Sequence, residues 1–291
     1  MDGSPARLRW KVLLRRERRT GVSVGEGAVE RMRGPRAYAS FIGIGLAAGL
    51  LSGLFGVGGG TVIVPLLVLL LAFDQRLGAG TSLAAIVPTA LVGVVSYAVH
   101  DSVAWIPALI LAVGSVVGAQ IGTRLLPRIS QTALRWCFVG FLVVVIVSLF
   151  LVIPSRGAVL ELTWVTGPLL LVLGLFTGVL AGLIGVGGGI VVVPALMLAF
   201  GTSDLVAKGT SLLMMIPTAI SGTIGNLRNH NVDLVAAAFV GLSACTTTAL
   251  GAWLATLINP LVGNILFAVY LAFIAVQMAL KAIRGRKPRS A

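Results

Sequence analysis

The stretch GLLSGLFGVGGGTVIVPLLVL, residues 49–69, returns as GVLAGLIGVGGGIVVVPALML at residues 178–198. With the same shift of 129 residues and no gap, 24 of the 49 positions in 45–93 are identical to those in 174–222. The identities include glycine, proline, threonine and serine, which an apolar composition alone would not align. The chain is therefore a duplicated unit.

Charge is scarce between the two ends of the chain. The 291 residues are 57% hydrophobic and 11% charged, and only seven basic and five acidic groups fall within residues 37–280. A soluble domain carries about 25% charged residues, and a helical crossing takes about 20 residues. The composition predicts an all-α polytopic membrane protein. The basic tails contain a single aromatic residue, Trp10, and no patch in which aromatic and basic residues alternate, so nucleic acid is not expected as a partner despite the net charge of +13.

Each copy contains five apolar segments in the same order. We predict a basic cytoplasmic leader, a first repeat, a linker, a second repeat and a basic cytoplasmic tail, at residues 1–36, 37–153, 154–163, 164–281 and 282–291. The apolar segments of the first repeat are 37–55, 61–72, 82–99, 104–123 and 133–153, and those of the second are 164–184, 190–201, 211–227, 234–256 and 260–281. The second segment is too short to cross a bilayer, since twelve residues rise about 18 Å against about 30 Å of hydrocarbon. These segments are predicted half-helices.

The positions of lysine and arginine favour a hairpin, rather than a single crossing, around each glycine run. Basic loop residues tend to stay in the cytoplasm. With both tails inside, the hairpin leaves 20 basic residues inside and two outside, Arg156 and Lys208, whereas a single crossing gives 17 and five. The predicted fold is two inverted-topology repeats, each with a glycine-broken re-entrant element and three transmembrane helices. Inverted repeats with broken helices in matching positions are typical of secondary transporters.

The two glycine runs predict an anion site. Glycines let a ligand approach the backbone, and the half-helix that follows presents unpaired N–H groups with partial positive charge. Two such ends meeting at the midplane would bind an oxyanion. The runs are Gly56, Val57, Gly58, Gly59 and Gly60 in the first copy, and Gly185, Val186, Gly187, Gly188 and Gly189 in the second. The alternative, close helix packing, is the interpretation we favour for the glycines spaced by four within 45–53 and 114–122.

Hydroxyl groups and prolines flank both runs at matching positions. The hydroxyls could cap the third segment, donate to a bound oxyanion, or do both. They belong to Thr81, Ser82, Thr210 and Ser211. Within the same segments, Pro88 and Pro217 each free a backbone carbonyl and predict a hinge.

A polar patch follows the third segment of the second copy only. Its members are Asn226, Arg228, Asn229 and His230. We interpret it as a cytoplasmic loop with a topology-setting arginine, and a gate or a contact to substrate charge is the alternative. Asp101 and Asp233 lie near segment ends and are interpreted as solvated loop acids rather than proton carriers.

The doubled GVGGG motif with its following VP, together with the GTS and PTA triplets, resembles the sulfite exporter TauE/SafE family of membrane permeases over about residues 40–281. The resemblance implies a transporter of sulfur-containing anions, such as sulfite or sulfoacetate-like organosulfonates, in the plasma membrane with both termini cytoplasmic. H⁺ or Na⁺ is the expected coupling ion because the chain contains no ATPase domain, and a homodimer is left open. Export by alternating access is the expected direction and mechanism.

Two other functions remain as alternatives at this point. The same site could serve an anion channel, or a carrier of another small organic anion. A membrane enzyme or sulfur relay would need Cys137 or Cys245, which we interpret as small buried apolar residues. No nucleophile–base pair and no metal-ligand cluster is apparent in the sequence, so no catalytic residue, metal or cofactor is expected.

Overall fold

The computed structural model of the protein describes residues 35–151 and 163–284, and within these ranges every element is helical. The helices of the first repeat are α3 (Pro35–Phe55), α4 (Gly60–Leu70), α5 (Gln75–Ala98), α6 (Trp105–Leu125), the short 3-10 helix η1 (Leu126–Arg128) and α7 (Gln131–Leu151). Those of the second are α8 (Thr166–Ile184), α9 (Gly189–Phe200), α10 (Asp204–Arg228), α11 (Leu234–Leu257) and α12 (Pro260–Arg284). Seven of the described helices are long and apolar enough to cross a membrane. The prediction of an all-α polytopic membrane protein is confirmed.

The chain divides into two units, Met1–Ser40 and Phe41–Ala291. The described part of the first unit is the beginning of α3. The predicted leader, linker and tail lie outside the described residues except for a few positions at their ends. Both glycine runs belong to the second unit.

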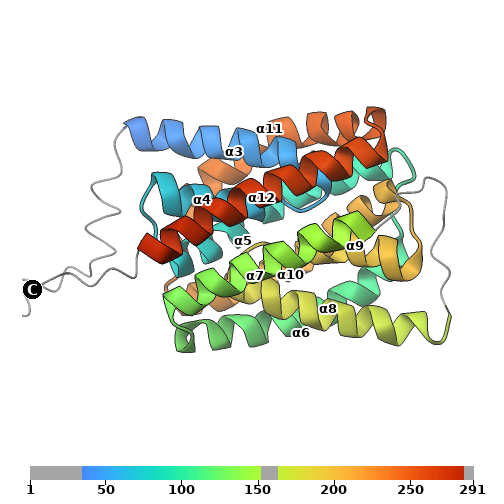
Figure 1. Ribbon diagram of the computed structural model, residues 1–291, viewed down its shortest axis with the longest axis horizontal. Helices are drawn as coiled ribbons and strands as arrows, with labels where there is room; N and C mark the ends of the chain where they lie inside the picture. Colours follow the sequence, from blue (N-terminus) through green and yellow to red (C-terminus); the bar gives the residue numbers. More distant parts are fainter. Residues whose placement is uncertain (1–34, 152–162, 285–291) are drawn as a thin grey trace, which may run out of the picture. The chain divides into compact units, whose positions relative to one another are not determined.

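Each glycine run turns the chain back on itself. The short helices α4 and α9 begin at the last glycine of each run, and the glycine before it has a left-handed φ, 75° in the first copy and 86° in the second. Figure 1 shows α4 running back along α3, and α9 running back along α8. The rings of Phe41, early in α3, and Phe73, just after α4, have centroids 6.3 Å apart, as this return requires. The prediction of a hairpin instead of a single crossing is confirmed.

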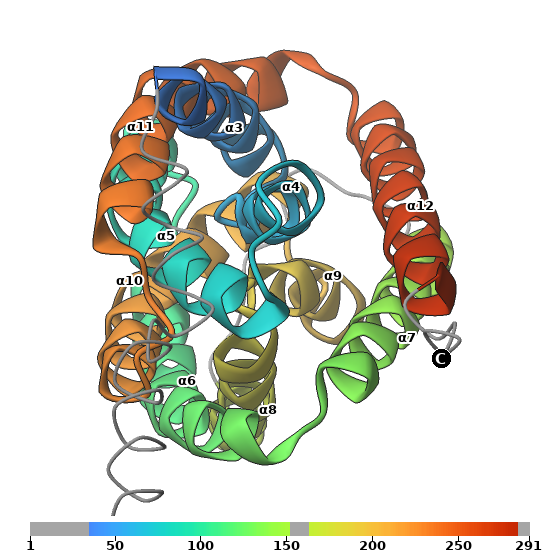
Figure 2. The same cartoon turned by 90° about the vertical axis from the view of Figure 1, so that its left-hand side faces the viewer.

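The two short helices lie inside a ring of longer ones. Figure 2 looks along the helices and shows α4 and α9 at the centre, with α5 and α10 on one side and α7 and α12 on the other. One cluster of buried apolar side chains, including Leu83 and Met214, fills the side of α5 and α10. A second cluster joins Val57 and Val186 of the glycine runs to Phe267 of α12. The valines of both glycine runs thus belong to the second cluster.

Each close contact between a helix of the first repeat and a helix of the second has an equivalent in which the two repeats are exchanged. Helix α3 packs on α11 as α8 packs on α6, and a Cβ on any glycine of these seams would collide with a carbonyl of the facing helix. Gly45, Gly49 and Gly53 face the carbonyls of Val240, Ala244 and Thr248, and Gly174, Gly178 and Gly182 face those of Leu111, Ser115 and Ala119. Each residue in the second set lies 129 positions from its equivalent in the first. The repeats are therefore related by an approximate two-fold exchange, and the packing interpretation of the four-spaced glycines within 45–53 and 114–122 is confirmed.

Helices α5 and α10 begin seven residues earlier than the sequence predicts, at 75 and 204 instead of 82 and 211. Their N-caps are Asp74, whose carboxylate accepts two backbone N–H bonds of 2.8 Å, and Ser203, whose hydroxyl accepts from the N–H of Val206. The first turns of these two helices are polar and contain glycine, which is typical of loops. Here they pack against other helices, and this packing overrides their low helix propensity. The prediction that Thr81–Ser82 and Thr210–Ser211 cap these helices is wrong, since they lie about two turns inside them.

The two cysteines are less buried than the sequence predicts. Cys137 on α7 is exposed and Cys245 on α11 is half-buried. Large apolar side chains on α7, such as Trp136 and Val144, are exposed as well. In a membrane protein, apolar residues can face lipid as well as the protein core. An apolar segment therefore does not by itself indicate that its cysteine is buried.

Candidate anion-binding site

The structure brings the two glycine runs into direct contact. A Cβ on Gly60 would lie 2.7 Å from the Cα of Val186 and 2.9 Å from the carbonyl oxygen of Gly185. A Cβ on Gly189 would lie 3.0 Å from the carbonyl oxygen of Gly56. The N-terminal ends of α4 and α9 therefore meet with no room for side chains between them. Six glycines of the two runs have φ between 70° and 86°, a region that side chains rarely adopt.

Most backbone N–H groups at this junction have no acceptor. Residues 57–61 and 186–190 are all buried, and in the described structure their N–H groups donate no hydrogen bond of good geometry, although residues 58–59 form a weakly bonded turn. The N–H groups of Gly56 and Gly185, just before, donate to Ser52 and Ala181 at 2.8 Å. Buried N–H groups without an acceptor are rare in folded proteins, and at a helix N-terminus they carry partial positive charge. The junction is built to accept an anionic ligand from the backbone.

Buried hydroxyl groups lie beside these N–H groups. Thr61, in the first turn of α4, and Ser82, on α5, are fully buried, and neither hydroxyl has a hydrogen-bond partner. The hydroxyl of Tyr270 on α12 is also buried and unpaired, and it lies within interaction range of Thr61. Ser211, the repeat equivalent of Ser82, donates to the carbonyl of Gly56 at 2.8 Å. Thr61 and Tyr270 thus provide two hydroxyl groups near the first run, and the equivalence of Ser82 with Ser211 places Ser82 near the second run.

Sequence reasoning missed Thr61 and Tyr270. Their equivalents 129 positions away are Ile190 and Phe141, so the polar character exists in one copy only. The duplication is recognised from identical residues, so a hydroxyl group that occurs in one copy only gives no signal. The signal that could have found Thr61 is a single hydroxyl within an otherwise apolar and matching half-helix.

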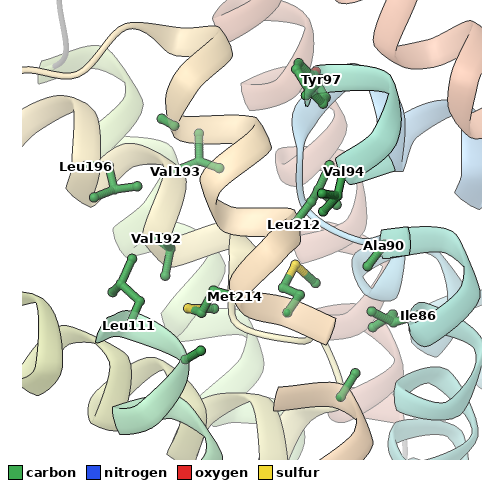
Figure 3. Packing of buried hydrophobic residues seen from close by; sticks show 14 of the residues in the cluster. Ile86, Ala90, Val94, Tyr97, Leu111, Val192, Val193, Leu196, Leu212 and Met214 are labelled. Atoms are coloured by element: carbon green, nitrogen blue, oxygen red, sulfur yellow. The ribbon is translucent and has the colours of Figure 1, made fainter. Parts of the chain in front are cut away.

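Two equivalent apolar side chains close the junction on the side of α5 and α10. The side chain of Met215 lies where a Cβ on Gly58 or on Gly187 would be. Ile86, the equivalent of Met215 in the first repeat, lies beside the same two glycines. Figure 3 shows the packing next to them, where Val192 of α9 faces Met214 of α10. These buried apolar side chains give this side a low local dielectric, which strengthens any electrostatic interaction at the N–H groups.

The threonines predicted near the site hold the two repeats together instead of capping their own helices. Thr81 accepts a hydrogen bond from the N–H of Asp233 at the start of α11, and Thr210 accepts one from the N–H of Ala104 at the start of α6. Pro88 and Pro217 lie inside the continuous helices α5 and α10. Their role as hinges stays a prediction.

The polar patch of the second copy lies at the end of α10, away from the glycine runs along that helix. Asn226 is buried and donates to the carbonyl of Gly222 at 2.9 Å, whereas Arg228 and His230 are exposed. Asn229 donates to the carbonyl of Thr123 at 3.0 Å, which joins the end of α10 to the end of α6. The structure does not bring this patch to the site.

The predicted position of Lys208 was wrong, because this residue forms a buried ion pair with Asp204. Lys208, predicted in an outside loop, lies within α10 with 8% of its surface exposed, and its ammonium is 3.4 Å from the carboxylate of Asp204, which is 1% exposed. A Cβ on Gly56 would lie 2.5 Å from the Cβ of Lys208, so the stem of the lysine starts against the first glycine run. The carboxylate also acts electrostatically on Tyr97, whose hydroxyl donates to the carbonyl of Gly53 at 2.6 Å. The i,i+4 spacing of aspartate and lysine was the sequence signal for this pair.

A family model described as "Sulfite exporter TauE/SafE" matches residues 9–149 and 170–291. The chain is 27% identical to the "Probable membrane transporter protein YunE" of Bacillus subtilis, over 68% of this chain and 81% of the relative. It is 29% identical to a "Probable membrane transporter protein" of Xylella fastidiosa strain 9a5c, over 78% and 91%. A protein of the same description, MJ0441 of Methanocaldococcus jannaschii, is 27% identical over 63% and 70%. No solved structure matches the chain significantly.

Proposed function

Because the chain belongs to the sulfite exporter TauE/SafE family, we propose that it is a secondary transporter of sulfur-containing oxyanions such as sulfite or an organosulfonate. It is a multi-pass membrane protein of a transporter family. The proposed site is the junction of α4 and α9, and the proposed location is the plasma membrane with both termini in the cytoplasm. The family's description is the ground for proposing export.

The observation that supports this proposal is the set of buried N–H groups at residues 57–61 and 186–190, which donate no hydrogen bond of good geometry in the described structure. An oxyanion has several acceptor oxygens and can take bonds from both runs at once. The gain at a helix end is about 0.3–1 kcal/mol, up to about 2 kcal/mol when partly buried. Weak binding of this kind lets a carrier release its substrate. The hydroxyls of Thr61, Ser82 and Tyr270 are the proposed additional donors.

The exchange symmetry of the repeats supports alternating access as the mechanism. Figure 1 shows α3 and α8 running in opposite directions, as repeats with inverted topology would. Two repeats that exchange equivalent contacts can interconvert two states of similar energy, one open to each side of the membrane. Under this proposal the site stays near the midplane while the surrounding helices move.

The charge distribution at the helix ends supports the proposed orientation. Arg76, at the start of α5, donates to the carbonyl of Ile129 at 2.7 Å, so the start of α5 and the end of η1 lie together. Arg128 in η1 and Arg228 at the end of α10 belong to the same end of the helices, where α12 also finishes (Figure 1). The positive-inside rule assigns such an end to the cytoplasm.

Counterflow in proteoliposomes tests the proposed function. Vesicles that contain the full chain and unlabelled sulfite, sulfoacetate, taurine or sulfate are diluted into the labelled compound. We expect transient accumulation of label for at least one sulfite- or sulfonate-class anion, because a carrier exchanges its substrate through an occluded site. Flux without counterflow would support the anion channel, and the absence of any flux or binding for the whole panel would refute the proposal.

A cysteine-free variant tests the enzyme or sulfur-relay alternative. Cys137 and Cys245 are on different helices, α7 and α11, and neither is fully buried. We expect Cys137→Ser combined with Cys245→Ser to keep full counterflow. Loss of activity in a folded double variant would favour sulfur chemistry over simple transport.

A further inference from the structure

Two apolar side chains, one from each repeat, lie directly against both glycine runs. Met215 of α10 takes the place of a Cβ on Gly58 or on Gly187. The Cδ1 of Ile86 on α5 lies 3.0 Å from the place of a Cβ on Gly60 and 3.3 Å from that on Gly187. Ile86 and Met215 are 129 positions apart, and both are fully buried. Together they form an apolar wall at the place where the two runs meet.

The hydroxyl groups near the junction lie elsewhere around it. Those of Thr61 on α4 and Tyr270 on α12 are buried and unpaired, and Figure 2 shows α12 on the opposite side of the short helices from α5 and α10. The unpaired hydroxyl of Ser82 is one turn before Ile86 on α5. An anion at the junction would therefore meet hydrogen-bond donors with some of its atoms and the apolar wall with the others.

The apolar wall offers nothing to a charged oxygen. The side chain of Ile86 has no polar atom, and the thioether of Met215 is at most a weak acceptor and has no hydrogen to donate. A charged oxygen that is buried without a donor is costly. Sulfate has an oxygen at each of its four corners, so one of them would face this wall. A sulfonate has three oxygens and one carbon on its sulfur, and sulfite has three oxygens and a lone pair.

We propose that Ile86 and Met215 determine the specificity of the site, by selecting oxyanions with three oxygens over those with four. The inference rests on the proposed function, in which the anion binds at the glycine runs. The three oxygens accept hydrogen bonds from the N–H groups of both runs and from the hydroxyls nearby. The remaining corner of the anion, a lone pair or a small alkyl group, packs on the apolar wall. Sulfate and phosphate are rejected because their fourth oxygen has no donor there.

The two residues of the wall differ in stiffness. Ile86 is β-branched, which restricts its rotamers, whereas Met215 is unbranched and flexible and fills irregular space. The part of Met215 that meets Gly58 and Gly187 is its terminal methyl group. This methyl group can move aside for a substituent, so the wall accepts the lone pair of sulfite and the carbon of a small alkanesulfonate.

The test uses the full chain in proteoliposomes with labelled methanesulfonate. Methanesulfonate and sulfate have the same tetrahedral shape and differ by a methyl group or an oxygen at one corner. We expect methanesulfonate to show counterflow, and sulfate to inhibit this counterflow at least about tenfold more weakly than unlabelled methanesulfonate does, because its fourth oxygen is left unpaired. Methylphosphonate and phosphate differ at the same corner but have similar charges near neutral pH. Methylphosphonate should therefore inhibit better than phosphate, which separates the effect of the oxygen from that of charge.

A polar side chain in the wall should relax this selectivity. Met215→Gln has a similar length and offers an amide donor to the fourth oxygen, so sulfate should gain at least about tenfold relative to methanesulfonate. Ile86→Gln makes the same change from the first repeat and serves if Met215→Gln does not fold. Met215→Ile installs the apolar residue of the equivalent position and is the matched control. It should keep the preference for methanesulfonate whatever its overall rate, because the wall stays apolar.

The outcomes separate this inference from the proposed function. Equal inhibition by sulfate and methanesulfonate in the unmodified chain would overturn the inference, and so would exchange of sulfate without exchange of methanesulfonate. An unchanged preference in a folded Gln variant, or a loss of preference in Met215→Ile as large as in Met215→Gln, would also overturn it, since the wall would then act through packing alone. Absence of counterflow with every tested anion would instead refute the proposed transport function.

Discussion

Thr81 accepts a hydrogen bond of 3.0 Å from the backbone N–H of Asp233. The residues related to them by 129 positions, Thr210 and Ala104, make the same bond at 3.0 Å, with the repeats exchanged. Each bond crosses from the third helix of one repeat to the start of the fourth helix of the other. The two repeats are thus joined by a pair of equivalent bonds, as expected for an approximate two-fold relation.

Removing these hydroxyls should loosen the joint between repeats. Thr81→Val and Thr210→Val each leave a backbone N–H without its acceptor, and we expect each to lower unfolding free energy by about 1–3 kcal/mol. Thermal unfolding in detergent measures the change. Thr246→Val is the control, because Thr246 is exposed and its hydroxyl bonds only within α11. Equal stability of all three variants would contradict a structural role for the inter-repeat bonds.

The hydroxyl of Thr61 should act in binding and not in folding. It is buried without a partner, so Thr61→Val should leave stability unchanged or raise it. A hydrogen bond to a charged group contributes about 1.5–3 kcal/mol, which predicts a rise in the KM for anion counterflow of about tenfold or more. Ile190→Val, the equivalent position on α9, controls for a change of shape at the helix end. An unchanged KM for Thr61→Val would remove this hydroxyl from the site.

Tyr270 should contribute to the same donor group as Thr61. Tyr270→Phe deletes one hydroxyl and installs the residue that stands at Phe141, the equivalent position in the first repeat. If both hydroxyls bind one anion, the combined Thr61→Val and Tyr270→Phe variant should differ from the sum of the single effects on KM. Strict additivity, measured by counterflow for the four proteins of the cycle, would show that the hydroxyls act separately.

Gly58 should tolerate no side chain. Its φ is 70°, and a Cβ there would collide with the methyl group of Met215. We expect Gly58→Ala to abolish most flux and to cost about 1–2 kcal/mol of stability from the left-handed backbone alone. Adding Met215→Ala removes the collision but not the backbone strain, so stability should recover only in part. Gly43→Ala, where no atom lies within 4 Å of a Cβ, is the control. Full flux in Gly58→Ala would indicate that the run merely packs.

Most of the fold could be predicted from the sequence because its signals are local. Hydropathy places α6 and α11 to within two residues, and the glycine runs with their short apolar segments predict α4 and α9 as half-helices. The starts of α5 and α10 were wrong because Asp74 and Ser203 begin helices within polar, glycine-containing stretches. Burial of those stretches depends on helices far away in the chain.

The candidate site is only partly readable from the sequence for the same reason. The GVGGG runs are visible as a repeated motif, but the lack of an acceptor for their N–H groups appears only when every neighbouring carbonyl is placed. The unpaired hydroxyls of Thr61 and Tyr270 and the pair of Asp204 and Lys208 break the repeat, so a search for identity between copies misses them.

The sequence by itself determined the duplication, the membrane class and the two half-helices, since composition and short-range glycine patterns act on the local chain. Only the tertiary structure decided that the two helix ends meet, that Lys208 is buried against Gly56, and that Thr81 and Thr210 join the repeats. These are contacts between segments more than 100 residues apart. They depend on how small residues let helices approach, which no single segment encodes.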